Sequence, residues 1–351
     1  MNLLGQKSFE KERKIKLFFF LASIALIALL LISVNNLLVS FILSLATYYL
    51  LAPAVDFLER KGFSRLLGTA IPFAAMGLGL ILAALVFSPE LLEQIRSLQE
   101  NQQKYVESAY SMIAQIEAWS SKFFRVIEMG GLKNDLQVFL TNWSVNFFQS
   151  LPSIFSQSIT ISIMVPFLSF FMLLDGRDFI RTLISIVPNN FFELTLNVHH
   201  QIGLQIGGFI RARLIESSII GLVVWLGLLV IGVPYSLILG LFAAVMNIIP
   251  YIGPFIGLLP AVLIAFSQGS DISGMTPIFI VYGIAQIIDN AVLVPFLVAR
   301  IVNLHPVVVI LSFLVGAQFF GVLGMIICIP MVSTLKVIST SIYKHYTDFK
   351  A

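Results

Sequence analysis

Long apolar runs separated by short polar segments make up most of the chain. Residues 17–52 contain no charged side chain, and residues 217–335 contain only Asp271, Asp289 and Arg300. An α-helix needs about 20 apolar residues to cross the hydrocarbon core of a bilayer. The pattern therefore predicts a chain that crosses a membrane several times.

The apolar runs divide into helices at polar or helix-breaking residues. We expect a tight turn at Asn35–Asn36 between the first two helices, and a new helix that begins at Ser88–Pro89. The charged residues from Asp175 to Asp178 are expected to end the fourth span. Residues 182–216 are interpreted as a re-entrant or surface-lying segment. Full crossings are predicted at residues 17–34, 37–52, 66–87, 154–174, 218–233 and 274–299.

Residues 89–150 have a different pattern, with twelve charged residues in a stretch of 62. Apolar side chains from Leu91 to Ile127 recur three and four residues apart, which is typical of an amphipathic helix. A second amphipathic stretch follows Gly130–Gly131. We expect a helical hairpin outside the bilayer.

Proline recurs within the apolar sequence after residue 233. Helices broken at membrane depth are tolerated only where protein or a water-filled cavity satisfies the freed backbone groups. Residues 236–266 are predicted to form two half-helices that meet at 247–254, and residues 306–335 two arms that meet at 316–324. Each pair is expected to be a re-entrant hairpin, with a full crossing as the alternative.

Composition supports this fold class. Of the 351 residues, 58% are apolar and 11% are charged, whereas a soluble domain carries about 25% charged residues. The net charge of +3 excludes a broad nucleic-acid footprint, and the single Cys328 excludes a disulfide framework. We expect an all-α polytopic membrane protein with about five or six crossings, two re-entrant hairpins and one extramembrane hairpin.

Asp289 is the strongest candidate for a functional residue. It lies eleven residues before Arg300, about 16 Å along a helix axis, and so near mid-bilayer. A charged Asp there costs roughly 2.5–3.5 kcal/mol, and such a group usually faces a cavity, binds a cation or takes up a proton. Gln286 shares its helix face and Asn290 follows it. The alternative is a structural hydrogen bond to Asn247 or a backbone carbonyl.

The predicted helix breakpoint is the second candidate. It contains Asn247, Pro250, Gly253 and Pro254. Broken helices leave backbone carbonyls and amides free to coordinate an ion or substrate. The alternative is a tight turn at the membrane surface.

Other polar residues are weaker candidates. His305 and Glu216 could relay protons, although a helix cap is the preferred interpretation of His305. Arg211, Arg213 and Glu216 are interpreted as a solvated or lipid-headgroup face. The adjacent His199–His200 point about 100° apart on a helix, so no shared metal is expected. Nucleotide-binding and hydrolase motifs are absent, and we expect neither an enzyme nor a cofactor.

Several sequence blocks together resemble one family. Asn247-Ile-Ile-Pro-Tyr-Ile-Gly-Pro-Phe-Ile-Gly-Leu-Leu-Pro260 resembles the Pro-Tyr-x-Gly-Pro signature of the autoinducer-2 exporter family, also described as PerM-type permeases. Further matches are Asp175-Gly176-Arg177, Gln286-Ile-Ile-Asp-Asn-Ala-Val-Leu-Val-Pro295, Leu304-His-Pro306, Phe320-Gly-Val-Leu-Gly324 and Ile329-Pro330. The resemblance covers nearly the full length and is strongest after Ile154.

The resemblance implies a multi-pass transporter of the bacterial inner membrane. Some members are associated with export of autoinducer-2, and others with exchange of sodium or lithium for protons. We therefore expect a secondary transporter for a small solute such as autoinducer-2, or for monovalent cations and protons. The alternative is a non-transporting oligomeric scaffold that acts through residues 89–150. The expected partners are the lipid bilayer, the solute or cation, and further copies of the chain, but no nucleic acid.

Orientation follows from basic residues in short loops. The segment up to Lys16 holds five Lys or Arg against two Glu, so both termini are expected in the cytoplasm and residues 89–150 outside. The predicted parts are membrane helices 1–88, the extracytoplasmic hairpin 89–150, the fourth span and cytoplasmic segment 151–216, a transport core 217–340 and a tail 341–351.

Overall fold

A computed structural model describes most of the chain outside its two longest gaps, which precede residue 37 and fall between residues 101 and 161. The described residues are 29, 33, 37–101, 103–105, 107–108, 111, 138, 142, 146, 161–182, 184–185, 187, 189–249, 253–269, 272–298 and 304–348. Most of the predicted first span, most of the hairpin at 89–150, Asp271 and Arg300 lie outside them.

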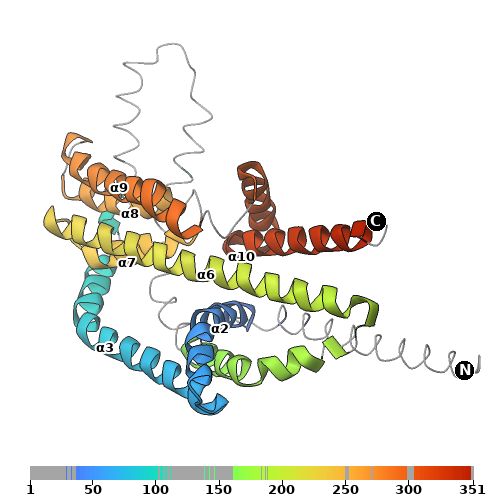
Figure 1. The fold of residues 1–351 in the computed structure, drawn as a ribbon. Coiled ribbons are helices and arrows are strands. Elements are labelled where there is room, and N and C mark those ends of the chain that lie inside the picture. Colours follow the sequence, from blue (N-terminus) through green and yellow to red (C-terminus); the bar gives the residue numbers. More distant parts are fainter. Residues whose placement is uncertain are drawn as a thin grey trace, which may run out of the picture. The chain divides into compact units, whose positions relative to one another are not determined.

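All described secondary structure is helical (Figure 1). The elements are α2 (Leu37–Arg60), α3 (Arg65–Glu100), a helix at 161–182, α6 (Asn189–Val230), α7 (Ser236–Asn247), α8 (Gly253–Ser267), the 3₁₀ turn η1 (Ile272–Met275), α9 (Thr276–Ile288), the π-helix η2 (Asp289–Val298) and α10 (Pro306–Asp348). Within the described residues, five segments are long and apolar enough to cross a membrane: Leu37–Arg60, Arg65–Glu100, Phe192–Val230, Thr276–Leu297 and Gly324–Ser341. The prediction of an all-α polytopic membrane protein is confirmed.

Three predicted helix ends are wrong. α3 runs through Ser88–Pro89 without a new start. An interior proline disfavours a helix, but Ile95 and Leu98 beyond it pack in the core of the second unit and hold the helix together. α6 replaces the predicted surface segment 182–216 and the separate fifth span with one continuous helix. The helix at 161–182 also continues past Asp175–Asp178.

The chain forms two compact units. The first comprises residues 1–76, 158–207 and 334–351. Its core includes Leu51, Val55 and Leu173. Beside this core, Arg177 pairs with Asp56 and Glu59 on α2 at 2.6 and 2.8 Å. These ion pairs explain why the helix at 161–182 extends through its charged residues.

Arg65, at the start of α3, joins the same cluster. It pairs with Glu59 at 3.0 Å and donates a hydrogen bond to the carbonyl oxygen of Leu173. The cluster therefore joins the end of α2, the start of α3 and the helix at 161–182.

The second unit comprises residues 77–157 and 208–333, and its core lies among α3, α6, α7, α8 and α9. Glycine lets α6 and α7 approach closely. A Cβ atom on Gly221 would lie 2.5 Å from the Cβ of Ala244, and one on Gly240 would lie 2.5 Å from the Cβ of Trp225. The two helices are therefore held at nearly backbone contact.

The predicted half-helices are confirmed as α7 and α8, which lie side by side (Figure 1). They contain 12 and 15 residues, or about 18 and 22 Å at 1.5 Å per residue. Both are shorter than the roughly 30 Å hydrocarbon core, so neither crosses it alone.

The far part of α3 supports the start of α7. Gln94 accepts a hydrogen bond from the backbone N–H of Ile238 at 3.3 Å, which satisfies one of the unpaired donors of a helix start. The hydroxyl of Tyr235 lies 2.8 Å from that of Ser97 and accepts a hydrogen bond from that of Tyr105 at 3.0 Å. These contacts hold α7, whose other end carries Asn247.

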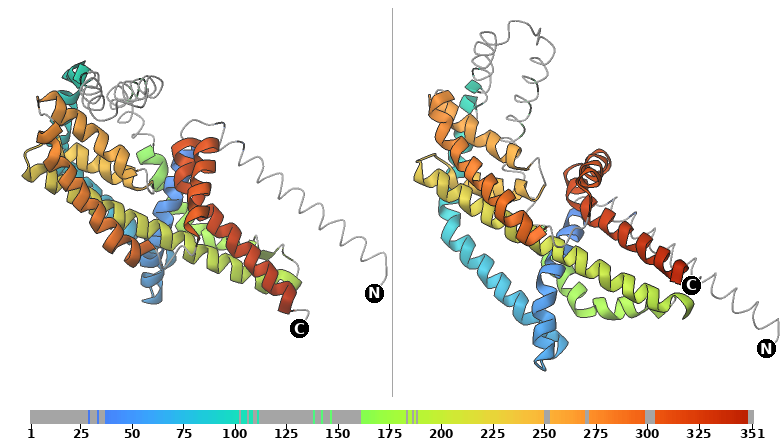
Figure 2. Two further views of the ribbon diagram at one scale, coloured as in Figure 1. Left: turned by 90° about the horizontal axis from the view of Figure 1, so that it is seen from above. Right: turned by 45° about the horizontal axis from the view of Figure 1, so that its top comes forward.

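The predicted junction of two arms at 316–324 is also confirmed. α10 is interrupted at Gly321, where φ is 59° and ψ is −140°, and Figure 2 shows the bend between the arms. The arms pack closely, since a Cβ atom on Gly316 would lie 2.5 Å from the carbonyl oxygen of Gly324. The first arm is too short to cross a bilayer, whereas the second contains the apolar segment Gly324–Ser341.

Candidate functional site

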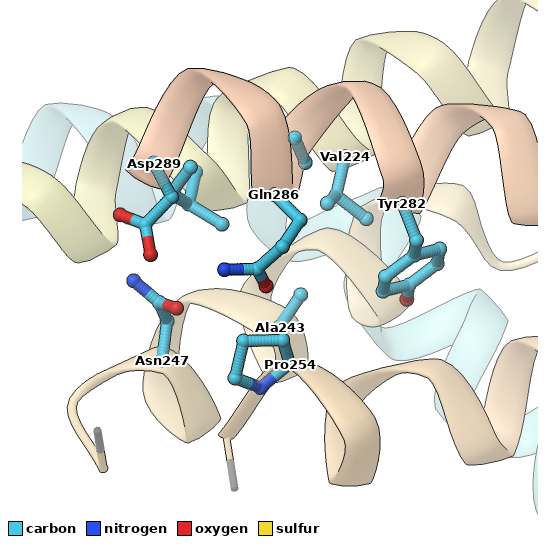
Figure 3. Close-up of a pocket in the computed structure, with 9 residues that line it drawn as sticks. Val224, Ala243, Asn247, Pro254, Tyr282, Gln286 and Asp289 are labelled. Carbon is cyan, nitrogen blue, oxygen red and sulfur yellow. The ribbon is translucent and has the colours of Figure 1, made fainter. Parts of the chain in front are cut away.

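A small, largely apolar cavity lies in the second unit, where α6, the α7–α8 breakpoint and the α9–η2 junction meet (Figure 3). Its volume is about 10 Å³, which is room for about one water molecule. The lining residues are Ile220, Val224, Ala243, Asn247, Pro254, Tyr282, Ala285, Gln286 and Asp289. The cavity thus combines apolar walls with amide and carboxyl groups.

Asp289 stands where α9 changes into the π-helix η2. π-Helices are rare and occur frequently at functional sites. The side chain is 6% exposed, and its Oδ1 has no hydrogen-bond partner among the described residues. A buried carboxyl oxygen without a donor is costly, and a proton or a cation would satisfy it.

Glu216 supplies a second carboxyl group from α6. It is fully buried, and Asp289 is one of the two charged residues that act on it electrostatically. Two neighbouring buried carboxylates resist being ionised together, and a hydrogen bond between two carboxyl groups requires a proton on one of them. The pair is therefore a candidate site for a proton or another cation.

Arg213 neutralises part of this charge. Its Nη1 pairs with Oε1 of Glu216 three residues later on α6, and its Nε donates to the carbonyl oxygen of Ile248 at 3.3 Å. Ile248 caps the end of α7, directly after Asn247. The guanidinium group therefore joins the acidic pair to the breakpoint.

The predicted solvated face is wrong for Arg213 and Glu216, which are 8% and 0% exposed. An i, i+3 pair lies on one helix side, and that side faces the core of the second unit. Arg213 is a candidate site residue that the sequence pattern did not predict. The sequence feature that could have indicated it is a basic residue three positions before an acid, at the start of a long apolar run.

Asn247 and Gln286 complete the polar wall. Asn247 is 2% exposed, and its Nδ2 has no partner in the described part of the chain. In Figure 3 its amide points toward the carboxylate of Asp289, and the amide of Gln286 points into the same space. Because an amide presents either oxygen or nitrogen after rotation, both side chains can offer oxygen to a cation.

Gly253 determines how tightly the breakpoint closes. A Cβ atom there would lie 2.0 Å from the carbonyl oxygen of Met246, so only glycine fits. Pro254 follows and lines the cavity, while Tyr282 donates a hydrogen bond to the carbonyl oxygen of Gly257 at 2.8 Å. Pro250 lies outside the described residues.

The remaining predicted residues lie away from the cavity lining. Asn290 is exposed on η2. His305 is exposed at the start of α10, and its Nδ1 accepts a hydrogen bond from the backbone N–H of Val307 at 3.3 Å. His199 and His200 are exposed on α6. The structure therefore brings Asp289, Gln286, Asn247, Gly253, Pro254 and Glu216 together.

Buried acids beside a broken-helix hairpin define a class of protein. Secondary transporters commonly place ion and substrate sites at discontinuous helices near the bilayer midplane, and this chain is a multi-pass membrane protein with buried acids beside a broken-helix hairpin. The sequence profile described as AI-2E family transporter matches residues 17–344. The chain belongs to this family, and the predicted resemblance is confirmed.

Individual relatives agree with this assignment. YrrI of Bacillus subtilis (strain 168) is 27% identical over 319 residues, covering 90% of this chain and 89% of YrrI. YueF of the same organism is 29% identical, covering 82% and 79%. PerM of Escherichia coli (strain K12) is 30% identical over 179 residues, half of each chain. The first two carry provisional names as transport proteins and the third as a permease.

Proposed function

We propose that this protein is a secondary transporter that exchanges a monovalent cation for a proton at the Glu216–Asp289 pair. The observation that carries the proposal is the burial of two interacting carboxyl groups, each with an oxygen that has no donor among the described residues. A proton and a small cation both satisfy such oxygens, and each excludes the other. That competition is the minimal requirement for exchange.

The size of the cavity favours a small ion over an organic solute. A volume of about 10 Å³ is far below the roughly 300 Å³ of the smallest typical ligand pockets. The oxygen atoms of Glu216, Asp289, Asn247 and Gln286 suit hard cations, which prefer oxygen ligands.

A larger cavity in the same unit does not suit a polar solute. It has a volume of about 450 Å³ between α3, α6 and α7. Its lining is apolar except for Ser218 and the indole N–H of Trp225, and the Ser218 hydroxyl already donates to the carbonyl oxygen of Leu214. Export of autoinducer-2 would therefore need polar groups that this cavity lacks.

The proposed setting is the bacterial inner membrane, with both termini cytoplasmic and the protein present as a homo-oligomer. Glu216 lies fourteen residues before the end of α6 at Val230, about 21 Å along the helix axis. The acidic pair would then lie deep in the membrane, close to the tip of the α7–α8 hairpin.

Proteoliposomes with an internal pH-sensitive dye test the exchange. An imposed sodium gradient should drive a dye response that is lost in Glu216→Gln and Asp289→Asn. Glu193→Gln is the matched control, because Glu193 is exposed on the same helix, and it should retain the response. A silent dye with the unmodified protein would refute cation–proton exchange.

The rival functions are separated by two further measurements. Efflux of labelled autoinducer-2 from vesicles with a silent dye would identify an organic-solute exporter. A cellular phenotype that survives Asp289→Asn but is lost on deletion of residues 89–150 would identify the scaffold.

A further inference from the structure

Within the part of the chain that the structure describes, three buried charged groups determine the net charge of the site. Arg213 forms an ion pair with Glu216, and Asp289 lines the neighbouring cavity and acts on Glu216 electrostatically. Among the described residues that line the cavity, Tyr282 is the one other titratable group, and its hydroxyl is used as a donor to Gly257. α7 and α8 contribute uncharged residues to the lining, Ala243, Asn247 and Pro254.

These groups leave one negative charge to be neutralised. An arginine guanidinium does not lose its proton in proteins, so Arg213 contributes +1 in every state. Glu216 and Asp289 contribute −2 when both are ionised, which gives −1. One bound proton or one bound monovalent cation makes the site neutral.

Other occupancies carry a net charge in a buried, largely apolar cavity. The site without proton or cation has a net charge of −1, and the site with both has +1. Uncompensated buried charges are strongly unfavourable. The two neutral states are therefore the ones that the site can adopt while it moves across the membrane.

From this balance, and resting on the proposed function, we infer that Arg213 fixes the exchange at one monovalent cation per proton and makes it electroneutral. The ion pair with Glu216 and the hydrogen bond to Ile248 hold the guanidinium group beside the acids. The fixed positive charge thus leaves a single negative charge to be shared by the two exchanged ions.

The dependence on membrane potential tests this inference directly. Proteoliposomes are clamped with potassium and valinomycin, and sodium-driven proton flux is compared at zero and at inside-negative potential. The exchange is expected to be unaffected by the potential, and parallel uptake of radioactive sodium should give one proton per sodium ion. Flux that changes with the imposed potential would overturn the inference while leaving exchange itself established. A protein without any sodium-dependent response would instead refute the proposed function.

A charge-balanced double variant provides the second test. Glu216→Gln alone leaves the site neutral without any ion, and exchange should fall by about tenfold or more, because binding a cation or proton would then create an uncompensated charge. Combining Arg213→Gln with Glu216→Gln returns the site to −1 through Asp289 alone. The double variant should therefore recover electroneutral exchange that the single variant loses.

Folding of both variants is checked by size-exclusion chromatography and thermal unfolding in detergent. A folded double variant that is as inactive as Glu216→Gln would overturn the role of Arg213 as the balancing charge. So would a single Glu216→Gln variant with unreduced exchange. A role of Arg213 in stability alone would move the unfolding temperature and would not restore flux in the double variant.

Discussion

Substitution of Gly253 by alanine should disable the site through backbone displacement. The new Cβ atom would lie 2.0 Å from the carbonyl oxygen of Met246, 2.6 Å from its carbonyl carbon and 2.9 Å from the Cα of Asn247. Real Cβ contacts are essentially never shorter than 3.0 Å, so the new Cβ and the carbonyl oxygen of Met246 must separate by at least 1.0 Å. All three are backbone atoms, and no rotamer change can relieve the overlap.

The expected effect on transport is large because the displaced residues adjoin the cavity. A misplacement of 1 Å at a functional site can cost about 100-fold in rate, and we expect a loss of that order in sodium-driven proton flux. The strain of forcing an extra carbon into a packed site is about 1–3 kcal/mol. Thermal unfolding in detergent should show a correspondingly lower midpoint.

Gly283→Ala is the matched control. Gly283 is exposed on α9, and a Cβ atom there would have nothing within 4 Å. Alanine is favoured over glycine in a helix by about 1 kcal/mol, so this variant should keep full flux and unfold at the same or a higher temperature. Equal flux in Gly253→Ala and Gly283→Ala would refute the argument that the tight breakpoint positions the site.

Three further predictions concern stability. Gly227→Ala should destabilise the protein by about 1–3 kcal/mol, because its Cβ would lie 2.5 Å from Cγ1 of Val281, and Val281→Ala in the same chain should restore part of that loss in an unfolding assay. Arg177→Ala should lower the free energy of unfolding by less than about 1 kcal/mol, and the loss should depend on salt, because the ion pairs of Arg177 are half-exposed. Arg65→Ala should lower it by more, because this variant loses a less exposed ion pair and a backbone hydrogen bond. Burial and a neighbouring tyrosine hydroxyl raise the pKa of Tyr105. The stability that this group contributes is therefore present below about pH 10 and declines above it. In unfolding experiments at alkaline pH, the stability difference between wild type and Tyr105→Phe should shrink.

Local sequence signals were sufficient for the broken helices. Proline and glycine in apolar sequence mark places where the backbone hydrogen-bond ladder stops, and both the α7–α8 breakpoint and the Gly321 bend fall where these residues gather. Asp289 is predicted as a candidate for a related reason, because an acid in a long apolar run is conspicuous. These features depend on the residues themselves and their near neighbours.

The buried role of Glu216 depends on contacts that are distant in sequence. An Arg and a Glu three residues apart look the same on a surface helix and on a buried one. What distinguishes them is Asp289, which acts electrostatically on Glu216 from another helix. The same limit explains the misplaced start of α6, since its charged residues indicated a surface segment until their partners were known. The π-helical geometry of η2 likewise has no local signal that hydropathy or periodicity would detect.

The π-helix also bears on how the protein fits its bilayer. The apolar segment Thr276–Leu297 has 22 residues, which would extend about 33 Å as an uninterrupted α-helix. Hydrogen bonds from i to i+5 place more residues in each turn, so the same segment reaches less far and comes closer to the roughly 30 Å hydrocarbon thickness. A helix with excess length accommodates a thicker bilayer by reducing its tilt. The helix that carries Asp289 has little excess length of this kind, so hydrophobic mismatch in a thicker membrane acts directly on the part of the helix around Asp289.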